Sequence, residues 1–204
     1  MLYTNILSKT QQEILPFISS FSKEYYLVGG TAISLQIGHR TSIDFDLFKL
    51  GNVNKAKIKE RFTAYNIPFQ LIYSDAESFH VIANGVKITF FQYPFKIPTK
   101  KRFDTIKMPD LLNLAAMKAY ALGRRAKWKD YVDLFLIIKK HHSVEEISTA
   151  AKTIFEDVFS PKLFLQQLCY FEDIDYTEEV FFIGNQYEEQ EIKDFLIEIS
   201  TKKI

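Results

Sequence analysis

The sequence contains one cysteine, seven glycines and six prolines among 204 residues. A single cysteine, Cys169, excludes an internal disulfide framework and a zinc site built from several cysteines. The low glycine and proline content excludes collagen-like and Pro/Gly-rich disordered chains. No run of about 18 uncharged apolar residues is found, so we expect no membrane span. We also recognise no secretion signal at the start and expect a cytoplasmic protein, in which a lone thiol stays reduced.

Charge is distributed unevenly along the chain. The formal net charge is +1, but residues 1–107 carry 14 Lys/Arg against 8 Asp/Glu, whereas residues 108–204 are net acidic. A basic half favours a polyanionic ligand such as a nucleotide or RNA. The lysines of residues 54–65 also fit an ordinary solvated helix face, so charge alone does not decide between the two interpretations.

The first half of the chain alternates predicted helices and strands. Ser8 and Gln11 form a capping box that opens a helix to about Ser20. A β-prone run at 25–28 ends at two glycines, and a brief helix at 31–38 follows. The other predicted elements are a strand at 42–48, a basic helix at 54–65, a strand at 69–74, and two strands within 78–95 that a type I′ turn at Asn84-Gly85 connects.

The second half is predicted to be helical, because apolar residues recur there at helical spacing. Segment 96–107, with Pro98 and the run Lys100-Lys101-Arg102, is the expected boundary. The sequence therefore predicts an α+β chain with an α/β domain at 1–107 and a helical bundle domain at 108–204. The predicted helices are 109–123, 128–140, 144–158, 161–170 and 186–200.

Two carboxylates, Asp44 and Asp46, alternate with the apolar residues Ile43, Phe45 and Leu47. Side chains at i and i+2 of a strand point to one face with their bases roughly 6–7 Å apart, so the two carboxylates can share a divalent cation. Magnesium, with manganese as the alternative, suits hard oxygen ligands that act together with substrate phosphates. An isolated Asp-x-Asp is also typical of an edge strand with one wet face.

The sequence Gly29-Gly30-Thr31 stands at the start of the helix that precedes these acids. Glycines let a phosphate approach the backbone closely, while the first N–H groups of the helix point at it. Next to Asp-x-Asp, this turn predicts a phosphate site beside a metal site. Arg40, just before the acidic strand, either contacts a triphosphate or neutralises the two acids.

Lys118 falls among the apolar residues of its predicted helix, at about 100° per residue between Leu114 and Leu122. A lysine that faces a core needs an anion, unless it snorkels to solvent. The anion is either a structural carboxylate or the phosphates of a nucleotide. Asp130, in the next helix, is by itself an ordinary favourable charge near a helix N-terminus.

The strings YYLVGGTAISLQIGHRTSIDFDLF and AAMKAYALGRRAKWKDYVDLFLI together resemble the AbiEii/AbiGii toxin family of nucleotidyltransferases. The resemblance covers about residues 22–140. It implies a polymerase-β-like nucleotidyltransferase domain, a mixed sheet with flanking helices, followed by the helical bundle. It also implies a nucleoside triphosphate substrate and the role of a toxin in a toxin–antitoxin or phage-exclusion pair.

Specific roles follow from the resemblance at the matching positions. Gly30 and Thr31, in the turn that begins at Gly29, would hold the nucleotide phosphates, and Asp44 and Asp46 would bind magnesium. The resemblance further implies that Lys118 contacts the nucleotide from the helical domain. It also implies that Asp130 is the second essential acid of the distal motif, where it either orients Lys118 or acts as a base. Polymerase-β-type enzymes commonly carry a third metal-binding carboxylate on a later strand. Here Thr89 stands where that acid might be, and no Asp or Glu occurs between Glu77 and Asp104.

The leading hypothesis is a magnesium-dependent enzyme that moves a nucleoside monophosphate onto an acceptor hydroxyl, with a tRNA 3′ end as a plausible acceptor. Thr89 motivates an alternative, a nucleotide- or RNA-binding module without catalysis. A third hypothesis is an interaction module that binds a cognate antitoxin. Between residues 172 and 198 ten acids accompany one base, Lys193, which fits a basic partner as well as a solvated surface.

Overall fold

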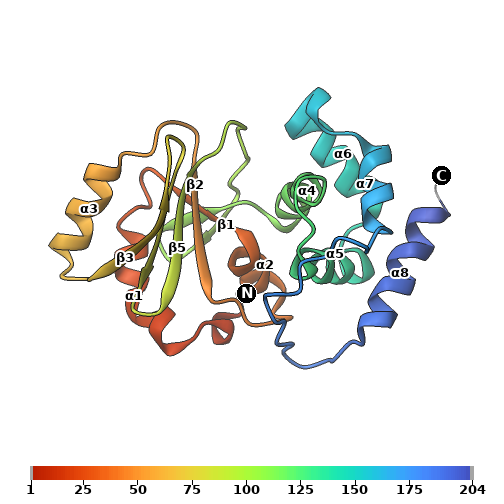
Figure 1. Cartoon of the computed structure of the whole chain (residues 1–204), viewed down its shortest axis with the longest axis horizontal. Helices are drawn as coiled ribbons and strands as arrows, with labels where there is room; N and C mark the ends of the chain where they lie inside the picture. The colour runs from red at the N-terminus through yellow and green to blue at the C-terminus, as the bar shows by residue number, and fades with distance from the viewer. Residues whose placement is uncertain (1, 203–204) are drawn as a thin grey trace. The chain divides into compact units, whose positions relative to one another are not determined.

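A computed structural model describes residues 2–202 (Figure 1). The chain divides into two compact units, Met1–Asp110 and Leu111–Ile204. All strands of the described part lie in the first unit and form one mixed sheet in the order β3-β4-β5-β2-β1-β7-β6. The strands are β1 (Tyr26–Val28), β2 (Asp44–Lys49), β3 (Phe69–Ser74), β4 (Ser78–Ala83), β5 (Val86–Gln92), β6 (Lys101–Phe103) and β7 (Ile106–Met108).

The centre of this sheet contains the two strands that carry the predicted acids and Thr89. Strand β2 pairs with β1 in antiparallel and with β5 in parallel orientation. The hairpin of β4 and β5 turns at Asn84 and Gly85, whose φ angles are +50° and +74°. Two consecutive positive φ values are those of a type I′ turn, so that prediction is confirmed.

Capping side chains and a left-handed glycine define several helix ends of the first unit. The capping box of Ser8 and Gln11 is confirmed at the start of α1. Gly38, with φ +66°, ends α2, and the Asn54 side chain caps α3. Phe17 of α1 contacts Phe62 of α3, Phe62 contacts Phe69 of β3, and Phe21, two residues after α1, contacts Phe90 of β5. Both helices therefore cover one face of the sheet. The helical elements here are η1 (Thr4–Ile6), α1 (Lys9–Ser19), α2 (Gly29–Ile37) and α3 (Lys55–Ala64).

Two features of the first unit differ from the sequence predictions. Segment 96–107, expected to be the boundary between the domains, contains β6 and most of β7, and β7 pairs with β1 in parallel orientation. The two strands have three residues each. Their own composition does not favour strands, but β7 pairs with β1 and β6 pairs with β7, and these pairings make them part of the sheet. Ile43, expected on the buried face, lies one residue before β2 and is 66% exposed.

The second unit is helical, as predicted. Tyr120 of α4 stacks on Phe155 of α6, and Phe135 of α5 packs edge-on against Phe195 of α8. Fully buried Tyr131 of α5 donates a hydrogen bond from its hydroxyl to the Tyr170 carbonyl. The helical elements here are α4 (Leu111–Leu122), α5 (Trp128–Lys140), α6 (Val144–Phe155), η2 (Glu156–Val158), α7 (Pro161–Leu168) and α8 (Glu189–Thr201).

Candidate active site

Strand β2 presents Asp44 and Asp46 on one face and buries Phe45 and Leu47 completely on the other. This alternation is the one that the sequence predicts for a half-buried strand. Both carboxyl groups keep partial access to solvent. The two acids therefore lie where a ligand can reach them.

The glycine turn after β1 lies directly against Asp46. Gly29 has φ +73°, a conformation that L residues rarely adopt. A Cβ built on Gly29 would overlap the Asp46 carboxylate, whose Cγ would be 3.0 Å away. The structure thus brings the predicted phosphate-binding turn and one predicted metal ligand into contact.

The Thr31 side chain connects the start of α2 to the start of β2 by a hydrogen bond. Its buried hydroxyl donates to the carbonyl of Asp44 and lies 2.9 Å from the Ser42 hydroxyl. Val28, the N-cap residue, provides no side-chain cap, so the first N–H groups of α2 receive no bond from it. The Thr31 hydroxyl already donates its hydrogen to the Asp44 carbonyl. An anion at this terminus would therefore bind the backbone N–H groups.

Arg40 is 4% exposed and lies against the second glycine of the turn. A Cβ built on Gly30 would overlap the Arg40 guanidinium and would be 3.2 Å from the Ser42 hydroxyl. The guanidinium also donates to the Thr41 carbonyl at 2.9 Å. Arg40 therefore brings a positive charge to the glycine turn.

Thr89 lies beside Asp46 on the neighbouring strand. In the parallel pairing of β2 and β5, the Cα partner of Asp46 is Thr89. Within residues 2–202, no cluster of three or more His, Cys, Asp or Glu side chains has the geometry of a metal site. On the two strands β2 and β5, the carboxylates are those of Asp44 and Asp46, both on β2.

His80 is a polar residue of this face that the sequence analysis does not single out. It is the antiparallel Cα partner of Thr89, and its Nδ1 lies 3.3 Å from the Thr89 Oγ1. The signal is present in the sequence. A two-residue turn at Asn84-Gly85 pairs Ala83 with Val86, and this register places residue 80 opposite residue 89.

Lys118 pairs with two buried acids of α5 in the second unit. Its ammonium contacts Asp130 Oδ1 and lies 3.0 Å from Asp133 Oδ2, and both acids are 0% exposed. Arg125 Nε is 3.2 Å from the other oxygen of Asp130. In the structure Lys118 pairs with carboxylates of its own unit, and the N-cap residue of α5 is Lys127.

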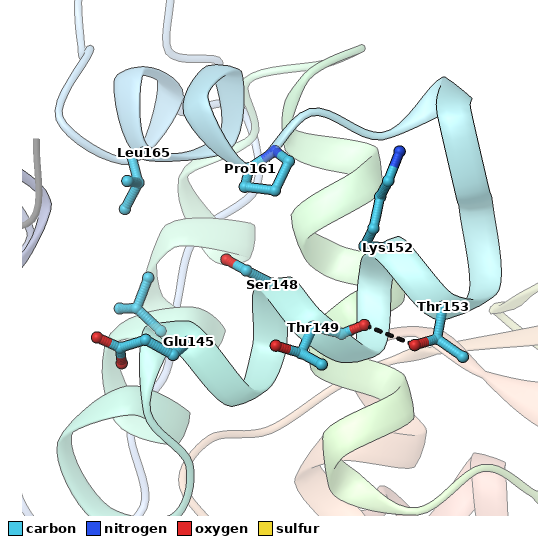
Figure 2. Close-up of a pocket in the computed structure, with 8 residues that line it drawn as sticks. Glu145, Ser148, Thr149, Lys152, Thr153, Pro161 and Leu165 are labelled. Atoms are coloured by element: carbon cyan, nitrogen blue, oxygen red, sulfur yellow. Dashed lines mark hydrogen bonds between the residues drawn. The ribbon is translucent and has the colours of Figure 1, made fainter.

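A groove in the second unit lies between α6 and α7 and has a volume of about 720 Å³. Figure 2 shows Ser148, Thr149 and Pro161 along its walls, with Lys152 at one end. None of the predicted site residues lines it. The groove is therefore separate from the chemistry that the sequence predicts.

Comparison with known proteins agrees with the fold and the motifs. A sequence model of the nucleotidyl transferase AbiEii toxin family, from type IV toxin–antitoxin systems, matches residues 17–102. The uncharacterized protein aq_aa25 of Aquifex aeolicus is 30% identical over 190 residues, which are 86% of this chain and 87% of that protein. The chain belongs to the AbiEii family. It is a nucleotidyltransferase of the α+β class, as the sequence predicts.

Solved structures show the same fold at low identity. MenT4, a nucleotidyltransferase toxin from Mycobacterium tuberculosis H37Rv, is 13% identical with a TM-score of 0.62, over 93% of this chain and 80% of MenT4. JHP933 from Helicobacter pylori is 14% identical with a TM-score of 0.52, over 98% of this chain and 91% of that one. Within residues 2–202 of the AbiEii chain, no helix is long and apolar enough to cross a membrane.

Proposed function

We propose that the chain transfers a nucleoside monophosphate from a nucleoside triphosphate to an acceptor hydroxyl, at the face formed by Asp44 and Asp46. The observation that carries the proposal is the contact between the Gly29 turn and Asp46. Backbone N–H groups that suit phosphates adjoin a carboxylate that suits a cation bound to those phosphates. Nucleotidyl transfer needs the triphosphate held in position and the charge on its phosphoryl oxygens stabilised.

The donor set of Asp44 and Asp46 fits magnesium, with manganese as the alternative. Magnesium typically binds proteins through one or two carboxylates and takes its other ligands from water and substrate phosphates. When bound, the ion supplies Lewis-acid stabilisation of charge on the phosphoryl oxygens. The start of α2 holds the phosphates, and Arg40 adds a positive charge beside them.

We also propose an RNA acceptor and a protein antitoxin as partner. The excess of basic residues in 1–107 supports an RNA acceptor, and a tRNA 3′ end offers the required hydroxyl. The toxin family supports a cognate antitoxin as partner. The nucleotide contact of Lys118 and the catalytic role of Asp130 stay predictions from the family resemblance.

Thr89 favours a second candidate function, which is nucleotide or RNA binding without turnover. A hydroxyl there cannot replace a metal-binding carboxylate, and the two-acid site is one acid short of the polymerase-β pattern. Binding that persists without transfer distinguishes this candidate from the enzyme.

The test is incubation of the purified protein with each of the four α-labelled nucleoside triphosphates, magnesium and total cellular RNA, beside an RNA-free control. Label on an RNA band supports the enzyme and identifies its nucleotide and acceptor class. Label on protein in the RNA-free reaction would show that the acceptor is a protein hydroxyl and not RNA. Nucleotide binding without any transfer would favour the binding module.

A further inference from the structure

A row of polar side chains crosses three neighbouring strands beside the acidic pair. Asp46 of β2 is opposite Thr89 of β5, and Thr89 is opposite His80 of β4. Residues paired in register on adjacent strands point to the same face of the sheet. His80 therefore shares the face of Asp46, with Thr89 between them.

The imidazole of His80 is held in place on both sides. Its Nδ1 lies 3.3 Å from the Thr89 hydroxyl, and the ring of Tyr73 on β3 is 5.7 Å from its own ring. The residue as a whole is half-buried. In the tautomer whose Nδ1–H donates to Thr89, the Nε2 lone pair is a free proton acceptor.

The surroundings of His80 favour its neutral form. Burial lowers its pKa below the ordinary 6.5, and the positive charge of Lys87 on β5 lowers it further. The carboxylates of Asp46 and of Asp75, next to Tyr73 in the β3–β4 turn, act in the opposite direction and do not overcome these effects. At neutral pH the imidazole can therefore take up a proton.

Transfer to a hydroxyl releases a proton that a nearby group must accept. Strand β5 provides no carboxylate for this purpose, and the Thr89 hydroxyl is too weak a base. Asp44 and Asp46 are already assigned to the cation. His80 is the basic side chain that the sheet register brings next to Thr89.

Resting on the proposed function, we propose that His80 accepts the proton of the acceptor hydroxyl and that Thr89 positions its ring. The acceptor oxygen forms a bond to the α-phosphorus, and the bond from that phosphorus to the bridging oxygen breaks. The bond's electron pair leaves with pyrophosphate. The hydroxyl proton moves to His80 Nε2 and is later released to water.

The test compares kcat between about pH 5 and pH 9 for the wild type and His80→Asn, since the amide can still bond to Thr89 but cannot take a proton. We expect a loss of about 100-fold at neutral pH, the lower end for general-base catalysis. The acid limb of the wild-type profile should disappear in the variant. His141→Asn, the same change at an exposed histidine of the second unit, should leave the rate and the profile unaltered.

A rescue experiment separates proton transfer from a structural role. Imidazole added in solution should raise the rate of folded His80→Ala at least 10-fold, because it can take up the proton without restoring any contact of the His80 side chain. A full-rate His80→Asn enzyme, or a wild-type profile without an acid limb, would overturn the role of His80. The wild-type profile decides this even if the variant does not fold. A wild-type protein that binds nucleotide but transfers no label would instead overturn the proposed function, and His80's role with it.

Discussion

The carboxylate of Asp46 fills the space that a side chain at Gly29 would need. Gly29 also has a φ of +73°, so both the backbone and the neighbouring acid require glycine there. The contact joins the end of β1 and the start of α2 to the acidic strand. A phosphate at the helix terminus would therefore lie beside a carboxylate that can share its cation.

Gly29→Ala should abolish most transfer and destabilise the fold by more than the backbone strain alone. Gly85→Ala is the matched control, because Gly85 has φ +74° and a Cβ added there would meet no atom within 4 Å. The control should cost about 1–2 kcal/mol of unfolding free energy and leave transfer intact. Urea unfolding and the transfer rate measure the two effects. Equal losses at both positions would show that the overlap with Asp46 is unimportant.

Lys118→Ala should destabilise the second unit by about 3–5 kcal/mol, because it leaves two fully buried carboxylates without their ammonium. Lys139→Ala removes a more exposed pair with Glu191 and should cost about 0–1 kcal/mol. Urea unfolding of both variants checks the difference. Activity lost in Lys118→Ala is meaningful only for protein shown to be folded. A loss as small as that of the control would contradict the structural role.

Thr31→Val should lower stability by about 1–3 kcal/mol, since it removes the buried hydroxyl that forms hydrogen bonds with the Asp44 carbonyl and the Ser42 hydroxyl. The transfer rate should fall as well, because the start of β2 loses its attachment to α2. Thr31→Ser keeps the hydroxyl and should retain most of both quantities. Chemical unfolding and steady-state kinetics on the pair test this. Wild-type behaviour of the valine variant would exclude the attachment.

Stability should depend on the charge of Glu178 in acid. Burial acts to raise its pKa, but the hydrogen bonds and charges of Lys127 and Lys129 lower it from 4.5 to about 2. Because the folded-state pKa is the lower one, the stabilisation is present above pH 4.5 and is lost as the pH falls toward 2. Solvent screening at this partly exposed side chain limits the gain to about 1 kcal/mol.

Glu178→Gln should therefore lose about 1 kcal/mol at neutral pH, and the gap to the wild type should close as the pH falls below 4.5. Unfolding free energies measured across this range give the comparison. A gap that stays constant with pH would show that charge at Glu178 does not stabilise the fold.

Local signals in the sequence are sufficient where a few neighbouring residues determine the structure. The capping box at Ser8 and Gln11 and the turn at Asn84-Gly85 are examples, because their hydrogen bonds and φ angles are local. The sequence does not predict strand β6, because its composition is that of a basic linker. Only its pairing with β7, which in turn pairs with β1, makes it part of the sheet.

The candidate site is predictable in part for the same reason. Asp44 and Asp46 follow from a two-residue period, and the glycine turn from its position between a strand and a helix. The contact of Gly29 with Asp46 depends on the packing of distant segments, which no local pattern shows. His80 emerges only when the hairpin register is followed across the turn.

The most direct test of nucleotidyl transfer uses one nucleoside triphosphate labelled at either the α- or the γ-phosphate, with magnesium and the acceptor RNA. We predict that α-label becomes attached to RNA while γ-label is released as pyrophosphate. We also predict that folded Asp44→Asn transfers neither. γ-Label attached to the acceptor, or full transfer by Asp44→Asn, would contradict the assignment of this face as a nucleotidyltransferase site.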